Sequence, residues 1–149
     1  MEWFVRAFIR ASLVWLALGV TLGVCMAVHP AWIVYRPAHV HMNLLGFVTM
    51  MIFGVAYHVV PRFSARPLFD RRLAGMHWWL ANAGLAAMVV GFVLRVTAGI
   101  PPAVSTATLA TGGVTEAIGA YVFVYNMWRT LGGYQLTAHP VARATRSAA

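Results

Sequence analysis

The chain alternates between long apolar segments and short polar ones, and the apolar segments determine its architecture. Four of them, at about 11–32, 38–60, 74–96 and 105–128, carry almost no charge. Each has about the twenty residues that a helix needs to cross the hydrocarbon core of a bilayer. Because lipid offers the backbone no hydrogen-bond partners, such segments are expected to be helical. The pattern predicts an all-α, integral membrane four-helix bundle over residues 1–131.

The polar segments between the spans carry arginine and no lysine, which gives a net charge of +8. Arg36 and Arg95 fall on one side of the predicted membrane. The other nine arginines fall on the opposite side: Arg6, Arg10, Arg62, Arg66, Arg71, Arg72, Arg129, Arg143 and Arg146. Since positive residues favour the cytoplasmic side, both termini are expected to be cytoplasmic in a multi-pass protein of the cell inner membrane. The basic tail, residues 132–149, is expected to be mobile.

The composition excludes several classes of protein. Residues are 61% hydrophobic and 9% charged, which does not fit a soluble domain and makes the lipid bilayer the surrounding partner. The arginines lie at the ends of apolar runs, so they indicate topology and anionic lipid rather than nucleic acid. The single cysteine, Cys25, excludes an intrachain disulfide.

The candidate chemistry lies at the start of the second span, where His39 and His41 stand one residue apart. An imidazole at membrane depth needs a hydrogen-bond partner or a metal. On a helix, residues i and i+2 are about 200° apart, so the two side chains point to nearly opposite sides and do not bind one metal together. We expect each to be a ligand of haem iron. The plainer interpretation is that both only bond to neighbouring helices or to headgroup water.

Other residues extend this candidate site. Arg36 and Arg95 lie at the same end of the spans, where they are placed to pair with haem propionates. His29 lies near the far end of the first span, at the same depth. Gly46 and Gly54 lower the surface of the second helix, which would let either a flat macrocycle or another helix approach closely. No Cys-x-x-Cys-His motif is present, so a haem would be held without a covalent bond.

The second span resembles the tenth transmembrane helix of the catalytic subunit of haem–copper oxidases, and its counterpart in nitric oxide reductases and NnrS-like membrane haem proteins. The shared pattern covers about 23 residues of the chain and consists of His39-x-His41, Gly54, His58 and Pro61. In that family the residue matching His39 ligates the high-spin haem and the one matching His41 ligates the low-spin haem. The position matching His58 is not an iron ligand there.

The resemblance implies an architecture as well as a cofactor. The catalytic subunit of the family has twelve helices in three pseudo-equivalent groups of four, with metal ligands on the second helix of each group. One such group has the size of this chain, so we expect a homotrimer. Each haem b would then be ligated by His39 of one chain and His41 of the next. The implied role is electron transfer in a respiratory or nitrogen-oxide context.

The departures from the family pattern leave the enzyme question open. The oxidases need an adjacent His-His pair for copper, and this chain has none, so neither copper nor oxidase activity is expected. Two other functions stay open: binding or sensing of NO or O2 at a five-coordinate haem, and a non-haem metal-handling or assembly subunit. The electron donor and acceptor are not identified by the sequence.

A different haem arrangement is also open. One chain could hold two stacked haems, the outer on His29 with His39 or His41, and the inner on His58 with His77. Glu116 lies near the middle of the fourth span and suits either a proton relay or a protonated carboxyl bonded to a neighbouring helix.

Overall fold

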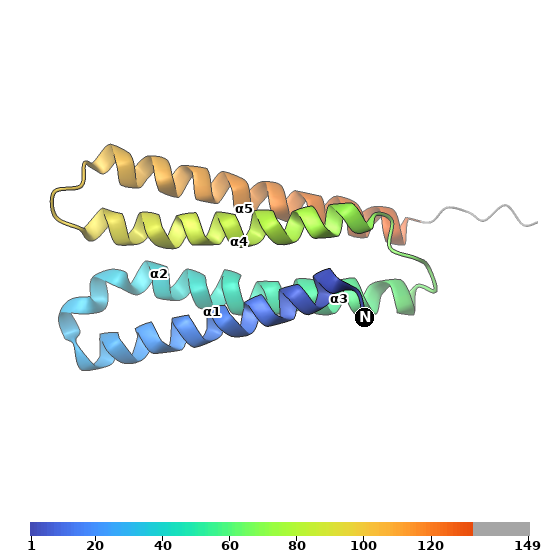
Figure 1. Ribbon diagram of the computed structural model, residues 1–149, viewed down its shortest axis with the longest axis horizontal. Helices are drawn as coiled ribbons and strands as arrows, with labels where there is room; N and C mark the ends of the chain where they lie inside the picture. The colour runs from blue at the N-terminus through green and yellow to red at the C-terminus, as the bar shows by residue number, and fades with distance from the viewer. Residues whose placement is uncertain (133–149) are drawn as a thin grey trace, which may run out of the picture.

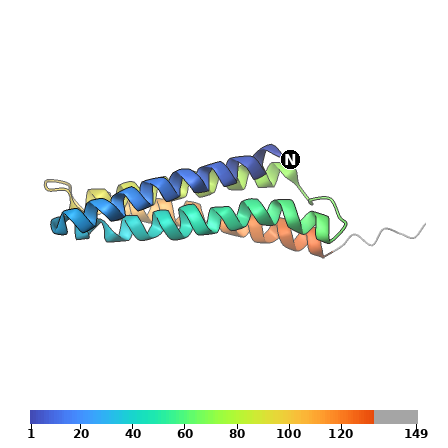
Figure 2. The same ribbon diagram turned by 90° about the horizontal axis from the view of Figure 1, so that it is seen from below.

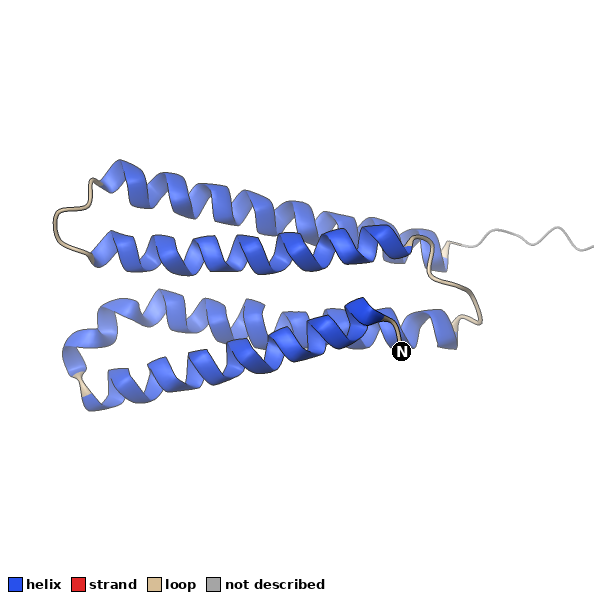
Figure 3. Ribbon diagram, in the orientation of Figure 1, coloured by secondary structure: helices blue, strands red, loops and turns tan. Residues whose placement is uncertain are grey.

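The computed structural model describes residues 1–132, which form four long helical rods in two antiparallel hairpins (Figures 1 and 3). The first rod is α1, Trp3–Val28. The second is continuous and consists of η1, Pro30–Tyr35; α2, Arg36–His41; η2, Met42–Thr49; and α3, Met50–Phe63. The other hairpin pairs α4, Arg71–Val96, with α5, Pro102–Leu131. In Figure 2 the hairpin of α1 and the second rod lies in front of the α4–α5 hairpin.

All four rods are long and apolar enough to cross a membrane, which confirms the predicted all-helical, four-span protein. The helices extend beyond the predicted spans at most of their ends, since the polar residues that flank each apolar run continue the helix. The division at residue 131 stays a prediction. The predicted basic tail, residues 132–149, lies outside the described residues except for Gly132.

The first helix ends earlier than predicted. α1 stops at Val28 instead of continuing to Trp32, and His29 has an extended backbone with φ −119° and ψ 92°. The cause is Pro30, because a proline disfavours helical geometry in the residue before it. The chain then turns through the short 3₁₀ helix η1, so His29 lies in the connection between two rods.

The second rod contains a segment that the sequence did not predict. Met42–Thr49 is wound as a π-helix, directly after the two histidines, before the rod returns to α-helical geometry at Met50. π-Helical turns are rare and are often found at functional sites. The wider winding changes which face of the rod the later residues present.

The α4–α5 hairpin is held by small residues that recur every seventh position. Gly84 and Gly91 on α4 face the series Ser105, Gly112 and Gly119 on α5, all of them buried. A Cβ atom at Gly84 would lie 2.9 Å from the carbonyl oxygen of Gly112, so the two backbones are in direct contact. Such close approach is how membrane helices gain packing energy without a hydrophobic driving force.

The two hairpins meet in an aromatic core near the N-terminus. Its rings come from α1, α3, α4 and α5, and include Phe8, Phe53, Tyr57, His77 and Phe123. His77 is fully buried there, 4.5 Å from Phe53 between ring centroids. Trp79, two residues later on α4, is 65% exposed.

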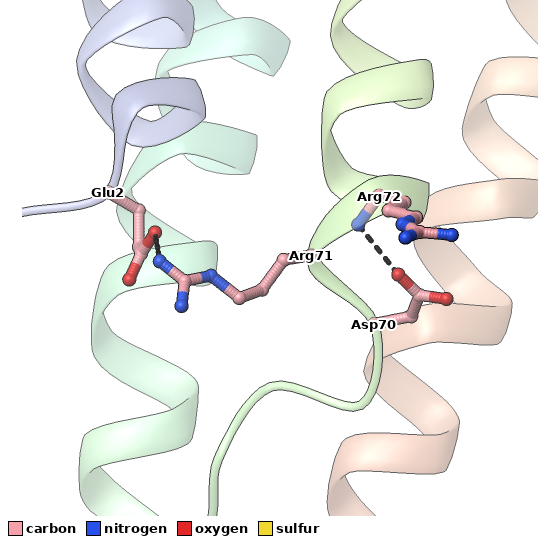
Figure 4. A network of polar contacts seen from close by, with 4 residues as sticks. All are labelled: Glu2, Asp70, Arg71 and Arg72. Carbon is pink, nitrogen blue, oxygen red and sulfur yellow. Dashed lines mark hydrogen bonds and ion pairs between the residues drawn. The ribbon is translucent and has the colours of Figure 1, made fainter.

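The loop between α3 and α4 is fixed to the end of α5. The amide of Asn126 bonds both backbone groups of Asp70: its Oδ1 accepts from the backbone N–H at 3.0 Å, and its Nδ2 donates to the carbonyl at 2.8 Å. The Asp70 side chain in turn caps α4 by accepting from the N–H of Arg72 (Figure 4). Nearby, Arg71 forms an ion pair with Glu2, which ties α4 to the start of α1.

Candidate functional site

Five of the seven predicted site residues lie at one end of the bundle. His39 and His41 are in α2, His29 and Arg36 flank η1, and Arg95 is in the last turn of α4. Figure 1 shows the connections from α1 to α2 and from α4 to α5 together at the left. We call this the histidine end. The opposite end, the arginine end, holds the N-terminus, the α3–α4 loop, the end of α5 and seven arginines: Arg6, Arg10, Arg62, Arg66, Arg71, Arg72 and Arg129.

His39 points towards α1 and is held there by the backbone. Its Nδ1 lies 2.8 Å from the carbonyl oxygen of Gly19. A carbonyl only accepts hydrogen bonds, so Nδ1 carries the proton and Nε2 keeps its lone pair. The Asn43 amide lies beside the ring: its Nδ2 donates to the backbone carbonyl of His39 at 2.8 Å and lies 3.4 Å from Nδ1, farther than the Gly19 oxygen. The imidazole is thus fixed both in orientation and in tautomer.

Two glycines of α1 make room for these side chains. A Cβ atom at Gly23 would lie 2.8 Å from Cε1 of His39, and one at Gly19 would lie 2.5 Å from Nδ2 of Asn43. Neither glycine was singled out from the sequence. The signal was present as Gly19-x-x-x-Gly23, the spacing that lets membrane helices approach closely.

His41 points away from α1 and towards α4. Its Nδ1 lies 2.8 Å from the carbonyl oxygen of Pro37 one turn earlier, and its ring centroid is 4.7 Å from that of Phe92. The same argument therefore puts the proton on Nδ1 and leaves the Nε2 lone pair free. As the i, i+2 spacing predicts, the two histidines contact different helices.

The two imidazoles share one property: in each ring, Nδ1 is hydrogen-bonded and Nε2 is free to bind a metal. Within residues 1–132, no hydrogen bond is made to Nε2 of either His39 or His41, and both residues are half-buried. Histidines that bind metals almost always donate their other ring N–H to a carbonyl, a carboxylate or water. That partner is already in place for both residues.

Gly46 and Gly54 face α1 instead of an open surface. A Cβ atom at Gly46 would lie 2.6 Å from Cβ of Trp15, and one at Gly54 would lie 3.1 Å from Cβ of Phe8. Of the two neighbours that the sequence left open, the helix is the one present. At these two glycines the second rod packs directly against side chains of α1. We therefore leave both glycines out of the cofactor site.

His58 and His77 do not form a second ligand pair. Arg62 donates from Nη1 to Nδ1 of His58 at 2.8 Å, which puts the proton of His58 on Nε2 and removes the lone pair that iron would need there. His77 is enclosed by aromatic rings, and its Nδ1 lies 3.1 Å from the Tyr57 hydroxyl. Both imidazoles are engaged by other side chains, which counts against the inner haem of the stacked arrangement.

The remaining candidates lie at the surface or alone. Arg36 and Arg95 are exposed, and neither guanidinium makes a hydrogen bond or ion pair with the residues that the structure describes. His29 is exposed and its ring packs 5.7 Å from that of Trp32. Glu116 has a buried Oε2 without a hydrogen-bond partner in the described part of the chain. Over those same residues, no three His, Cys, Asp or Glu side chains form a metal-binding group.

Comparison with known families agrees with the motif on the second rod. The profile of the family "Cytochrome C and Quinol oxidase polypeptide I" matches residues 31–135, from the start of η1 past the end of α5. The chain belongs to this family. The match includes the His39-x-His41 rod and the whole glycine-rich hairpin.

Several curated proteins are similar to the chain over about two thirds of its length. Cytochrome c oxidase subunit 1 of Rhodobacter capsulatus is 30% identical over 126 residues, which cover 68% of this chain and 23% of that protein. The Cbb3-type cytochrome c oxidase subunit CcoN1 of Stutzerimonas stutzeri is 30% identical over 118 residues, covering 62% and 24%. The chain therefore spans about a quarter of the length of these relatives and corresponds to one segment of an oxidase subunit I.

Proposed function

We propose that this protein is a membrane b-type cytochrome, which binds haem through Nε2 of His39 and Nε2 of His41 and takes part in electron transfer. Membership of the oxidase polypeptide I family supports the membrane and electron-transfer context. The observation that carries the proposal is the shared tautomer of the two histidines. Each donates Nδ1–H to a backbone carbonyl at 2.8 Å, so each offers an unpaired Nε2.

Haem bound in this way supplies one-electron chemistry, with a potential set by its axial ligands and by burial. His39 and His41 would both hold the iron and would leave no position for a gas, which suits electron transfer better than gas binding. The carbonyls of Gly19 and Pro37 fix the two imidazole rings. Arg36 and Arg95, both exposed at the histidine end without an acidic partner among residues 1–132, are the candidates for pairing with propionates.

The assembly that fits this ligand pair is a closed homotrimer. His39 faces α1 and His41 faces α4, so the two lone pairs do not converge on one site within a chain. A heterologous, cyclic contact brings His39 of one chain towards His41 of the next, which repeats around the ring. The sample would then contain one haem per chain, and cross-linking would stop at trimers. Cross-linked samples with only monomers or dimers would contradict this assembly.

The orientation we propose puts the arginine end in the cytoplasm and the histidine end at the outer face of the inner membrane. Seven described arginines lie at the first end, and only Arg36 and Arg95 at the second. Such a bias sets the topology of most inner-membrane proteins. A membrane-impermeant thiol reagent would label a cysteine introduced at Gly99, in the α4–α5 turn, from outside intact cells, and would not label one introduced at Phe63.

The experiment that tests the haem ligands is an optical spectrum of purified variants. His39→Ala and His41→Ala are each expected to lose the Soret band and the sharp bands of the reduced form. His58→Ala is the matched control on the same rod and is expected to keep them, because Nδ1 of His58 is occupied by Arg62. Full haem content in either of the first two variants would contradict the proposal.

Gas binding at a five-coordinate iron is the second candidate. The two histidines differ in a way that favours it, since His39 is held by a neighbouring helix, whereas His41 bonds only to its own. Without His41 as a ligand, the iron held by His39 could bind a gas. Carbon monoxide separates the two functions: a shifted Soret band of the reduced protein means an open iron, and an unchanged band means two bound imidazoles.

A further inference from the structure

A second site lies at the arginine end, away from the histidines. The structure has a pocket of about 380 Å³ there, between the start of α1, the end of α3, the following loop and the start of α4. Apolar residues on its wall include Pro61, Pro67 and Leu68, and three arginines also line it: Arg62, Arg66 and Arg71. The site therefore combines an apolar surface with concentrated positive charge.

Each of these guanidinium groups is held by one of its nitrogens. Nη1 of Arg62 donates to the carbonyl of His58 at 2.6 Å, and Nη1 of Arg66 donates to the carbonyl of Leu131 at 2.7 Å. Arg71 pairs through Nη2 with Glu2. These contacts fix the arginines, which lowers the entropy cost of binding a ligand.

The same contacts leave most of the donors free. A guanidinium has five N–H donors, and the other nitrogens of these three arginines have no partner in the described part of the chain. Three positive charges face the single carboxylate of Glu2 among the residues that line the pocket. The pocket thus has an excess of positive charge and of unpaired donors, which is the chemistry that recognises phosphate.

We infer that this pocket binds the phosphate group of an anionic phospholipid. It lies where the apolar spans end, at the depth of lipid headgroups, and basic pockets of membrane proteins at that depth attract anionic lipids. Free inorganic phosphate shares the charge and the acceptors. The apolar wall favours the lipid, because the glycerol and first acyl carbons cover Pro61, Pro67 and Leu68. This binding is independent of the haem.

The test uses the full chain in detergent, loaded with phosphatidylglycerol or phosphatidylcholine and analysed by native mass spectrometry. The double variant Arg62→Gln/Arg71→Gln is compared with Arg6→Gln/Arg10→Gln, which removes two exposed charges from α1 at the same end and outside the pocket. We expect the wild type and the control to bind one phosphatidylglycerol at least about tenfold more tightly than phosphatidylcholine. We expect the pocket variant to lose about tenfold in affinity for phosphatidylglycerol.

Several results would overturn the inference. One is an equal loss in the pocket variant and the control, which would mean general attraction by charge. Another is a wild type that does not discriminate between the two lipids, and this result needs no variant to fold. A third is binding of inorganic phosphate without binding of phosphatidylglycerol. Should the glutamine variant not fold, Arg62→Lys/Arg71→Lys keeps the charge but not the planar fork, and we expect it to bind more weakly than the wild type.

Discussion

The two hairpins of this protein pack by different means, and the difference fits our proposal that the second rod holds the cofactor. In the α4–α5 hairpin, glycines recur every seventh residue and the two backbones touch. In the hairpin of α1 with the second rod, glycines instead make room for side chains: Gly23 for His39 and Gly46 for Trp15. The α4–α5 hairpin is therefore a scaffold. The hairpin of α1 with the second rod holds individual side chains in fixed directions.

Among substitutions that distinguish the two hairpins, Gly112→Leu in the α4–α5 scaffold is expected to have the largest effect on stability. A Cβ atom there would lie 2.7 Å from the backbone N of Met88 and 2.8 Å from the carbonyl oxygen of Gly84, so the helices must separate. We expect the free energy of unfolding to fall by about 3 kcal/mol. Thermal unfolding in detergent measures it. Gly113→Leu is the control, since nothing lies within 4 Å of a Cβ atom at the next residue, and equal losses would contradict this account.

A smaller effect is expected from Asn126→Ala, which removes the link between the scaffold and the α3–α4 loop. Asn126 is fully buried and bonds both backbone groups of Asp70. Because those groups lose their partner, we expect the free energy of unfolding to fall by about 2 kcal/mol. The measurement is the melting temperature, which should be lower than in the wild type. Thr108→Ala on the same helix, whose hydroxyl bonds only to the carbonyl of Val104, is expected to change stability by less than about 0.5 kcal/mol. A melting temperature for the first variant as high as for the second would refute the role given to Asn126.

In the other hairpin, Gly23→Ala is expected to affect the cofactor more than the fold. The new Cβ would lie 2.8 Å from Cε1 of His39 and would push the imidazole away from the Gly19 carbonyl. We expect lower haem content with less than about 2 kcal/mol lost in stability. Thr21→Ala is the control on α1, because that side chain is exposed. Unchanged haem content in Gly23→Ala would show that this glycine does not position His39.

The smallest effect is expected from Glu2→Gln, which breaks the ion pair between the two hairpins at the arginine end. The side chain of Arg71 is 69% exposed, so solvent screens the pair and the loss is at most about 1 kcal/mol. The loss should disappear at high salt, where the wild type and the variant are compared by thermal unfolding. A large, salt-independent loss would mean that this contact holds the hairpins together.

The four helices could be predicted from the sequence because a membrane span depends on one simple property, the length of an uninterrupted run of apolar residues. It predicted the directions of His39 and His41 because helical geometry fixes the angle between neighbouring positions. Packing partners were harder to predict. Gly46 and Gly54 were equally suited to a macrocycle and to a helix, and only the three-dimensional structure shows α1 against them.

Two features were not predicted. His77 lies seven residues before Gly84, in register with the glycines of α4, so the heptad spacing indicated a buried position. The π-helical segment Met42–Thr49 has no comparable signal in the sequence.

The central claim is that His39 of one chain and His41 of another bind the same haem, and mixing two inactive variants tests it most directly. His39→Ala chains and His41→Ala chains are produced together in one cell, and haem is measured per chain. Random mixing in a closed ring restores about a quarter of the interfaces, because each restored interface needs one chain of each kind in the right order. We predict that haem returns to about that level. A mixture as colourless as either variant alone would contradict the shared site.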